Sequence, residues 1–288
     1  MQRGPCGRRH VRGGVCALWF LLLLAACGRP EARDPRPLVA VSVLPLAYFV
    51  ARIAGERVRV VVMLPPRANP ATYEPTLNQL ADVSHAALYV KLGHPHFPFE
   101  ATWLADLTAA AAGPLEVDLC AALADAGDDP HIWLAPHHAR SMSARIEAAL
   151  AAILPDDRAA LETNRRALDA DIDTVDRELR ARLAPHRGGR FVVFHPAWGH
   201  LARAYGLTQI AIERDGKAPD ARALAALIAS TRAAGVKVIF AQPHFDRASA
   251  DVIAREIGAR VEMLDPLAYD WVENLRAVAR ALPEGIVP

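Results

Sequence analysis

A long stretch of charged, helical sequence near the middle of the chain constrains the fold most. Residues 156–184 contain neither glycine nor proline. Their apolar side chains recur at helical spacing, at Leu161, Leu168, Ile172, Val175, Leu179 and Leu183. A helix of about 29 residues is about 43 Å long, which is more than one small domain needs. A coiled-coil arm is one interpretation, but aspartates on its other faces favour a helix that lies along a globular body and connects two parts of it.

Short apolar runs alternate with helical segments on both sides of this helix. The expected strands are residues 38–43, 58–63, 87–91 and 115–118 before it, and 191–194, 208–212, 236–241 and 260–264 after it. The expected helices are residues 46–54, 76–83, 99–112, 197–205, 220–234, 247–257 and 270–282. This alternation is typical of βαβ units with parallel sheets. We therefore predict an α/β fold with two parallel-sheet lobes, at residues 38–155 and 188–288, joined by one long backbone helix at residues 156–187.

The N-terminus has the pattern of a bacterial export signal. Four arginines precede an apolar run at residues 15–26, which is shorter than the roughly 20 residues that span a bilayer. The run ends in Leu-Ala-Ala-Cys at residues 24–27, which resembles a lipobox. We predict a lipoprotein signal peptide at residues 1–27, lipidation at Cys27 and a proline-rich tether at residues 28–37. An ordinary signal peptide with a chance cysteine is the alternative. The prediction places the protein on the periplasmic or cell-surface side of a bacterial membrane, anchored by lipid.

Charge and cysteine content narrow the possible partners. The 33 basic and 32 acidic residues nearly cancel. No basic stripe with interleaved aromatic residues is present, so the sequence predicts no nucleic-acid partner. If the signal is removed and Cys27 carries lipid, Cys120 is the remaining cysteine and no internal disulfide can form. Balanced charge suits a soluble body that binds a small ligand.

Several predicted strand ends carry side chains that bind metals. The loops that follow parallel strands converge at one edge of a sheet, where ligands bind. His195 and Asp265 directly follow strands of the second lobe. His131 lies in the loop after the fourth strand of the first lobe, and His94 and His96 follow its third strand. Imidazole nitrogens with one carboxylate suit Zn²⁺, and Mn²⁺ is the alternative, less favoured because it prefers more oxygen ligands.

Each position also has a simpler interpretation. His195 could be a hydrogen-bonded core histidine, His131 could cap the next helix, and Asp265 before proline is an ordinary turn signal. The other histidines are expected outside the site. We expect His137 and His138 to be exposed at a helix start, and His85, His186, His200 and His244 to lie at the surface or in packing.

Six motifs together resemble a known family. They are VSVLPL at 41–46, ATYEPT at 71–76, DPHIWL at 129–134, FHPAWG at 194–199, GKAP at 216–219 and LDPL at 264–267. They are similar, in order, to motifs of the zinc/manganese-binding solute receptors of metal ABC transporters, the ZnuA/TroA family, and most similar to its ZntC branch. The resemblance covers the chain from about residue 38 to the C-terminus. It implies a buried metal site in the cleft between two lobes, with His131, His195 and Asp265 as ligands.

Two departures from the family pattern matter. The family's first ligand is a histidine where this chain has Ala71, and the histidine-rich loop of many relatives is here a short stretch, residues 120–128, without histidine. Metal scavenging by such a loop is therefore not expected. We predict that His94 replaces the missing ligand, because both loops should open onto the same cleft. His96, a water molecule, or a ligand from elsewhere such as Glu213 are the alternatives.

The resemblance implies a receptor and no enzyme. The expected function is to capture a divalent transition metal, most favourably zinc, and to deliver it as a monomer to an ABC permease whose ATP hydrolysis occurs on another subunit. A periplasmic metallohydrolase is one alternative, since Ala71 could leave an open coordination position. However, the sequence contains no His-Glu-x-x-His and no Gly-x-Ser-x-Gly motif. A surface adhesin that uses metal only for stability is the other alternative.

Overall fold

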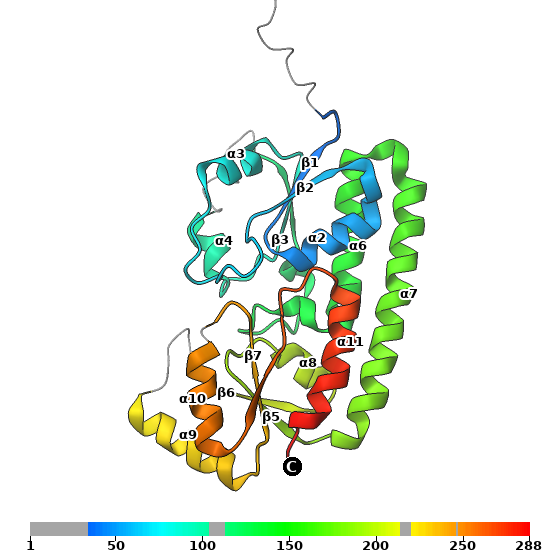
Figure 1. The fold of residues 1–288 in the computed structure, drawn as a ribbon. Coiled ribbons are helices and arrows are strands. Elements are labelled where there is room, and N and C mark those ends of the chain that lie inside the picture. The colour runs from blue at the N-terminus through cyan, green and yellow to red at the C-terminus, as the bar shows by residue number, and fades with distance from the viewer. Residues whose placement is uncertain (1–33, 104–112, 214–219, 246) are drawn as a thin grey trace, which may run out of the picture. The chain divides into compact units, whose positions relative to one another are not determined.

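The computed structural model describes residues 34–103, 113–213, 220–245 and 247–288, which contain two four-stranded parallel sheets (Figure 1). The first has the order β2-β1-β3-β4, from β1 (Leu38–Val41), β2 (Arg59–Val62), β3 (Leu88–Lys91) and β4 (Leu115–Asp118). The second has the order β6-β5-β7-β8, from β5 (Arg190–Val193), β6 (Thr208–Ala211), β7 (Val238–Ala241) and β8 (Arg260–Met263). The predicted α/β class with two parallel-sheet lobes is confirmed.

The same strand order in both lobes fixes where a ligand can bind. In each sheet the direction of chain winding reverses between the two central strands, β1 and β3 in one lobe and β5 and β7 in the other. Loops that leave the carboxyl ends of such strands diverge and open a crevice. The fold therefore directs attention to the segments that follow the strands of both lobes.

The helices that flank the sheets agree with the predicted alternation. They are α2 (Leu44–Ala54), α3 (Leu77–His85), α4 (Pro98–Trp103), α6 (Pro136–Ile153), α7 (Arg158–Leu183), α8 (Gly199–Ala204), α9 (Ala221–Ala233), α10 (Arg247–Ile257) and α11 (Trp271–Ala281). Local sequence explains several helix starts. The Thr76 hydroxyl accepts a hydrogen bond from the Gln79 amide and begins α3, and Asp270 caps α11 in the same way. No helix of the described residues is long and apolar enough to cross a membrane.

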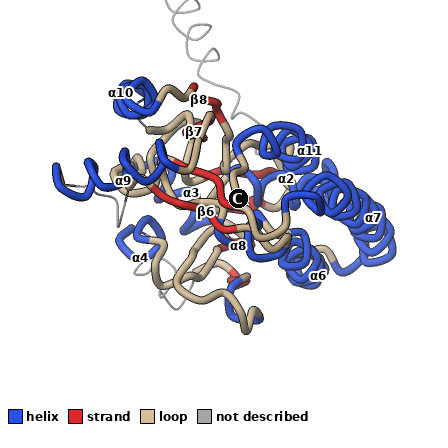
Figure 2. The backbone as a smooth tube through the Cα atoms, turned by 90° about the horizontal axis from the view of Figure 1, so that it is seen from below, coloured by secondary structure: helices blue, strands red, loops and turns tan. Residues whose placement is uncertain are grey.

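Helix α7 is the predicted connecting helix. Its 26 residues extend about 39 Å and lie between short 3₁₀ turns at Pro155–Asp157 and Ala184–His186. The six apolar residues of the predicted stripe are fully buried. Helix α7 packs against α2 and α6 on one side of the molecule and against α11, which follows the last strand (Figures 1 and 2). The helix thus binds to helices of both lobes, as expected for a spine rather than a free arm.

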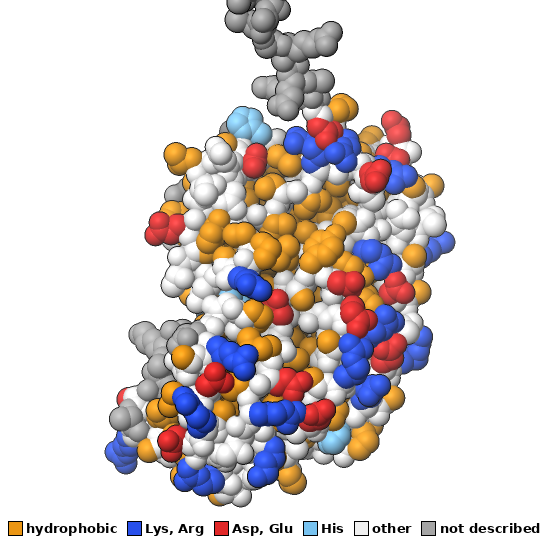
Figure 3. Space-filling model, in the orientation of Figure 1, with side chains coloured by type: hydrophobic (Ala, Val, Ile, Leu, Met, Phe, Trp, Pro, Cys, Tyr) orange, Lys and Arg blue, Asp and Glu red, His pale blue; other side chains and the backbone are white. Residues whose placement is uncertain are grey.

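Charged side chains add to these helix contacts. Arg52 on α2 pairs with Asp171 on α7 at 2.6 Å, and Arg276 on α11 pairs with Glu178 on α7 at 3.1 Å. Figure 3 shows acidic and basic side chains intermixed over the side formed by α7 and α11.

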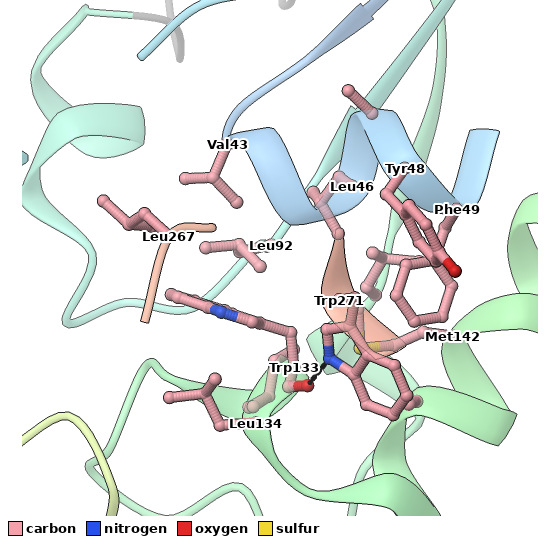
Figure 4. Packing of buried hydrophobic residues seen from close by; sticks show 14 of the residues in the cluster. Val43, Leu46, Tyr48, Phe49, Leu92, Trp133, Leu134, Met142, Leu267 and Trp271 are labelled. Carbon is pink, nitrogen blue, oxygen red and sulfur yellow. Dashed lines mark hydrogen bonds between the residues drawn. The ribbon is translucent and has the colours of Figure 1, made fainter. Parts of the chain in front are cut away.

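Two tryptophans connect the lobes through two hydrogen bonds. The Trp133 indole nitrogen donates to the Pro266 carbonyl at 2.7 Å. The Trp271 indole nitrogen donates to the Trp133 carbonyl at 2.7 Å (Figure 4). Both side chains are almost fully buried. The Trp271 ring also packs edge-on against Phe49 of α2, with ring centroids 5.5 Å apart. The start of α11 is therefore fixed to the first lobe, which opposes a wide hinge opening.

Removing the indole donor of Trp271 is expected to destabilise the fold. In Trp271→Phe the buried Trp133 carbonyl loses its hydrogen bond, which costs about 1–3 kcal/mol. Trp198→Phe is the matched control, because the buried Trp198 indole nitrogen makes no hydrogen bond with any described residue. Urea unfolding should give a free energy of unfolding lower in Trp271→Phe than in Trp198→Phe. Equal values would contradict a stabilising role for this bond.

Candidate metal centre

His131 is held in the orientation of a metal ligand by the carboxylate of Asp129. Asp129 Oδ1 accepts hydrogen bonds from the His131 backbone nitrogen at 3.0 Å and from its ring Nδ1 at 2.7 Å. The ring lies at the start of a 3₁₀ turn, Ile132–Leu134, and only 14% of the side chain is exposed. A histidine that donates from Nδ1 to a carboxylate keeps the Nε2 lone pair for a metal, which is a common second-shell arrangement.

The electrostatics of this pair favour a neutral imidazole beside an ionised carboxylate. Burial lowers the pKa of His131, the hydrogen bond and charge of Asp129 oppose this, and His195 and His94 lower the pKa further. Burial opposes ionisation of Asp129, but the hydrogen bonds from His131 together with the charges of His131 and His200 outweigh it and lower the pKa of Asp129. Neutral imidazole is the form that binds metal, so His131 is a competent ligand at neutral pH.

His195 follows β5 in the second lobe and is fixed by its backbone. The Gln242 side chain donates to the His195 carbonyl at 3.0 Å and accepts from the His195 amide at 3.3 Å, which ties the ends of β5 and β7 together. The ring of His195 stacks on Phe245, with centroids 4.7 Å apart. Its Nδ1 lies 3.4 Å from Oε2 of Glu213, which follows β6. His195 therefore has a rigid position and a carboxylate beside Nδ1, as His131 has.

The two histidines meet across the lobes. Their ring centroids lie 5.3 Å apart, with the ring planes at 74°. Because each Nδ1 lies beside a carboxylate, both Nε2 atoms are available for one ion, and a zinc–nitrogen bond needs about 2.0–2.1 Å. The structure thus brings together two residues that are 64 positions apart in the sequence.

Several buried polar atoms of this cluster lack partners. Among the described residues, His195 Nδ1, both carboxylate oxygens of Glu213 and Oδ2 of Asp129 make no hydrogen bond. Buried polar groups without partners are uncommon, and a nearby bound ion is one reason for them. The buried carboxylates of Asp129 and Glu213 lie beside the Nδ1 atoms of His131 and His195, which favours a cation at the Nε2 atoms of these rings.

Asp265 follows β8 and is half-buried. Its Oδ1 accepts a hydrogen bond from the Leu267 amide at 2.8 Å, and its backbone carbonyl accepts one from Asn274 Nδ2 at 2.8 Å. Burial raises the pKa of Asp265, against lowering contributions from the Leu267 amide and the charge of Arg67. A carboxylate with a raised pKa lacks counter-charge, which a cation would supply.

His94 is buried, and both of its ring nitrogens are engaged. Nδ1 accepts from the His96 amide at 3.0 Å, and Nε2 lies 3.0 Å from the Gly127 carbonyl. A neutral imidazole carries one proton, so in this arrangement Nε2 holds it and donates to Gly127. The ring is near enough to influence the pKa of His131. To act as a ligand, His94 would have to change both hydrogen bonds.

His244 was expected at the surface or in packing, outside the site. It follows β7 after Gln242, and its pKa is lowered to about 4 by burial and then by the positive charges of His195 and His131. Its position after a predicted strand, residues 236–241, was the same signal that selected the other candidates.

Ala71, the position of the missing family ligand, is exposed and lines a shallow pocket with Tyr73 and Trp103. His138 was expected to be exposed, and this was wrong, because the residue is 1% exposed and its ring contacts the Ile132 carbonyl and the ring of His200.

The sequence comparison decides the family. Residues 39–285 match the family model for ZnuA, described as zinc-uptake complex component A, periplasmic. The chain belongs to the ZnuA family. The predicted membership of the ZnuA/TroA family is therefore confirmed, while the closer assignment to the ZntC branch stays a prediction.

Individual members of the ZnuA family show the extent of the likeness. The chain is 27% identical to the high-affinity zinc uptake system protein ZnuA of Bacillus subtilis (strain 168), over 88% of the chain and 87% of that protein. It is 26% identical to the zinc-binding lipoprotein AdcA of Streptococcus pneumoniae (strain ATCC BAA-255 / R6), over 91% of the chain but 56% of AdcA. The chain thus spans about half the length of AdcA. A crystal structure of ZnuA superposes with a TM-score of 0.81 at 38% identity, over 87% of this chain and 99% of the other.

Proposed function

We propose that this chain is an extracytoplasmic receptor that binds a divalent transition metal, most favourably zinc, and delivers it to an ABC permease. The observation that carries the proposal is the pair His131 and His195, which come from different lobes with rings 5.3 Å apart and a carboxylate beside each Nδ1. Membership of the ZnuA family and the names of its zinc-binding relatives support the same function.

The proposed ligands are His131, His195 and Asp265. Two imidazole nitrogens and one carboxylate oxygen suit Zn²⁺, and Mn²⁺ is the less favoured alternative because it prefers oxygen-rich sites. Asp129 and Glu213 act as positioning residues, since each lies beside the Nδ1 of a ligand histidine. The prediction that His94 completes the site stays a prediction, and His244 competes with it for the fourth position.

Capture and release involve small movements. Helix α7 binds helices of both lobes, and Trp133 and Trp271 tie the start of α11 to the first lobe. A wide domain rotation would break these contacts, so we propose that the ligand side chains and the loops around them move while the sheets and strand ends keep their positions. The strand ends that carry His195 and Asp265 then form a rigid half of the site.

We further propose a monomeric binding protein without catalytic turnover. A zinc hydrolase needs an open coordination position and a nearby general base. The Asp129 carboxylate already accepts two hydrogen bonds from His131, so it orients that ring rather than serving as a base. The function is tested by zinc uptake in cells that lack their own receptor. Uptake that requires both this chain and a cognate permease supports the proposal, and uptake independent of the chain contradicts it.

We propose that Cys27 carries the lipid anchor, a position that lies outside the described residues. In Cys27→Ser the thiol that accepts the lipid is absent, so the protein should no longer sediment with membranes or incorporate labelled fatty acid. Cys120→Ser is the control, because Cys120 lies in the folded body and should not affect anchoring. Membrane association with continued labelling of Cys27→Ser would show that the lipobox interpretation is wrong.

A further inference from the structure

A second group of side chains that can bind a metal shares no residue with the proposed site. It consists of Asp125, from the short segment after β4, and of His137 and His138, at the start of α6; we name these three the α6-start cluster. One ligand atom from each residue lies within 4.8 Å of the others. The sequence predicted no metal scavenging by residues 120–128, because they contain no histidine. In the folded chain, however, that segment brings a carboxylate to two histidines of a neighbouring helix.

The geometry of the α6-start cluster is convergent. Asp125 Oδ1 lies 2.9 Å from His138 Nε2, and Asp125 Oδ2 lies 3.5 Å from His137 Nε2. The two ring centroids are 4.1 Å apart. Successive helix residues point about 100° apart, so adjacent side chains do not normally meet. Here both rings turn toward the same carboxylate.

The hydrogen bonds of His138 determine which of its ring nitrogens can bind an ion. The His138 ring is buried, and its Nδ1 lies 3.2 Å from the Ile132 carbonyl. A carbonyl only accepts, so Nδ1 carries the proton and a neutral ring presents the Nε2 lone pair to Asp125. Two acceptors then lie 2.9 Å apart. Bare acceptors repel each other, so this contact needs a proton between the two atoms or a metal ion beside them, bound to both at about 2.0–2.2 Å.

His137 makes the metal the better occupant. Its Nε2 lies 3.5 Å from Oδ2 of Asp125, on the side of the carboxylate that His138 does not contact. A proton can join Asp125 to one of the two rings only. One divalent cation would satisfy both nitrogens and the carboxylate at once, with the bond from Nδ1 to Ile132 fixing the tautomer of His138.

We propose that Asp125, His137 and His138 form a second, solvent-facing zinc site. Two imidazole nitrogens and one carboxylate oxygen supply three positions of a tetrahedral zinc site, and water supplies the fourth. The side chains of Asp125 and His137 are 67% and 50% exposed, so this ion exchanges with solvent more readily than one in the cleft. The proposal does not depend on which residues bind the cleft ion.

The α6-start cluster adjoins the segment that carries His131. The carbonyl that fixes His138 belongs to Ile132, the next residue after His131. The His138 ring also lies 4.8 Å from the ring of His200, whose Nε2 lies 2.8 Å from the Asp129 carbonyl. The second site is therefore built on the same loop as the cleft ligand, and an ion bound there would be held close to the receptor's own site.

Zinc titration of the full chain, stripped of metal beforehand, tests the proposal. By isothermal titration with Zn²⁺ alone, the wild type should bind two equivalents. Asp125→Asn and His137→Gln should each weaken the second equivalent about tenfold or more and leave the first unchanged, because each loses a ligand. Asp128→Asn is the control, since it makes the same chemical change in the same segment at a side chain that is 97% exposed.

The outcomes separate this site from the cleft. His195→Ala should lose the tight equivalent and keep the weaker one, so failure of the proposed function and failure of the second site are distinguishable. One equivalent in the wild type, or an unchanged second equivalent in Asp125→Asn, would overturn the proposal and leave a protonated His138 as the occupant of the contact. A loss of the second equivalent in Asp128→Asn would overturn the assignment of Asp125.

Discussion

His195→Ala is expected to lose tight zinc binding and to stay folded. His195 is 22% exposed and its backbone is held by Gln242, so the strand end does not depend on the ring. Apparent zinc-binding free energies of about 10–16 kcal/mol, divided among four ligands, give about 3 kcal/mol per ligand, a loss of more than about 100-fold in affinity. Competition with a chelator measures the affinity. Zinc should raise the melting temperature of the wild type and much less that of the variant, since the ion binds the folded state.

His131→Ala and Asp265→Ala should behave in the same way, and His85→Ala serves as the control. His85 is exposed at the end of α3, where its ring contacts Ser84 and the Ala81 carbonyl. The His85→Ala change removes an imidazole that belongs to none of the proposed ligands, so zinc affinity should not change. Wild-type affinity in all three ligand variants would show that the ion does not bind between the lobes.

The fold was largely predictable because its signals are local. Strands read from apolar runs agree with the eight observed strands to within one or two residues, and α7 follows from an apolar stripe without glycine or proline. The exceptions depend on distant residues. Strand β5 begins at Arg190, one residue earlier than predicted, where the Arg190 and Val287 backbones exchange two hydrogen bonds. That pairing joins residues almost 100 positions apart, and no local sequence pattern predicts it.

The candidate site was predictable only in part, for the same reason. Strand ends identified residues that can bind metal, but not their hydrogen-bond partners. The carbonyl of Gly127, 33 residues away in the chain, engages Nε2 of His94. The burial of His138 follows from its contact with the carbonyl of Ile132 and the ring of His200. Protonation and orientation of each imidazole are set by such contacts, and these decide which histidines are ligands.

The fourth ligand can be assigned by comparing His244→Ala with His94→Ala. We expect His244→Ala to weaken zinc binding about 10-fold or more, because His244 follows β7 beside Gln242, which holds His195, and a pKa of about 4 keeps its ring neutral. Among the described residues its ring nitrogens make no hydrogen bond that zinc would have to replace. His94→Ala should instead lower the free energy of unfolding by about 2–5 kcal/mol, since it leaves a buried cavity and removes the bonds to Gly127 and His96.

The zinc affinity and the free energy of unfolding in urea, both measured for the two variants in the same buffer, decide which histidine is the fourth ligand. His94→Gln refines the comparison, because a side-chain amide can still donate to the Gly127 carbonyl and so recover stability without supplying an imidazole. If His94→Gln is stable yet binds zinc far more weakly than His244→Ala, then His94 rotates to become the ligand in place of the histidine missing at Ala71. If both histidine variants keep wild-type affinity, water completes the coordination of a three-residue site.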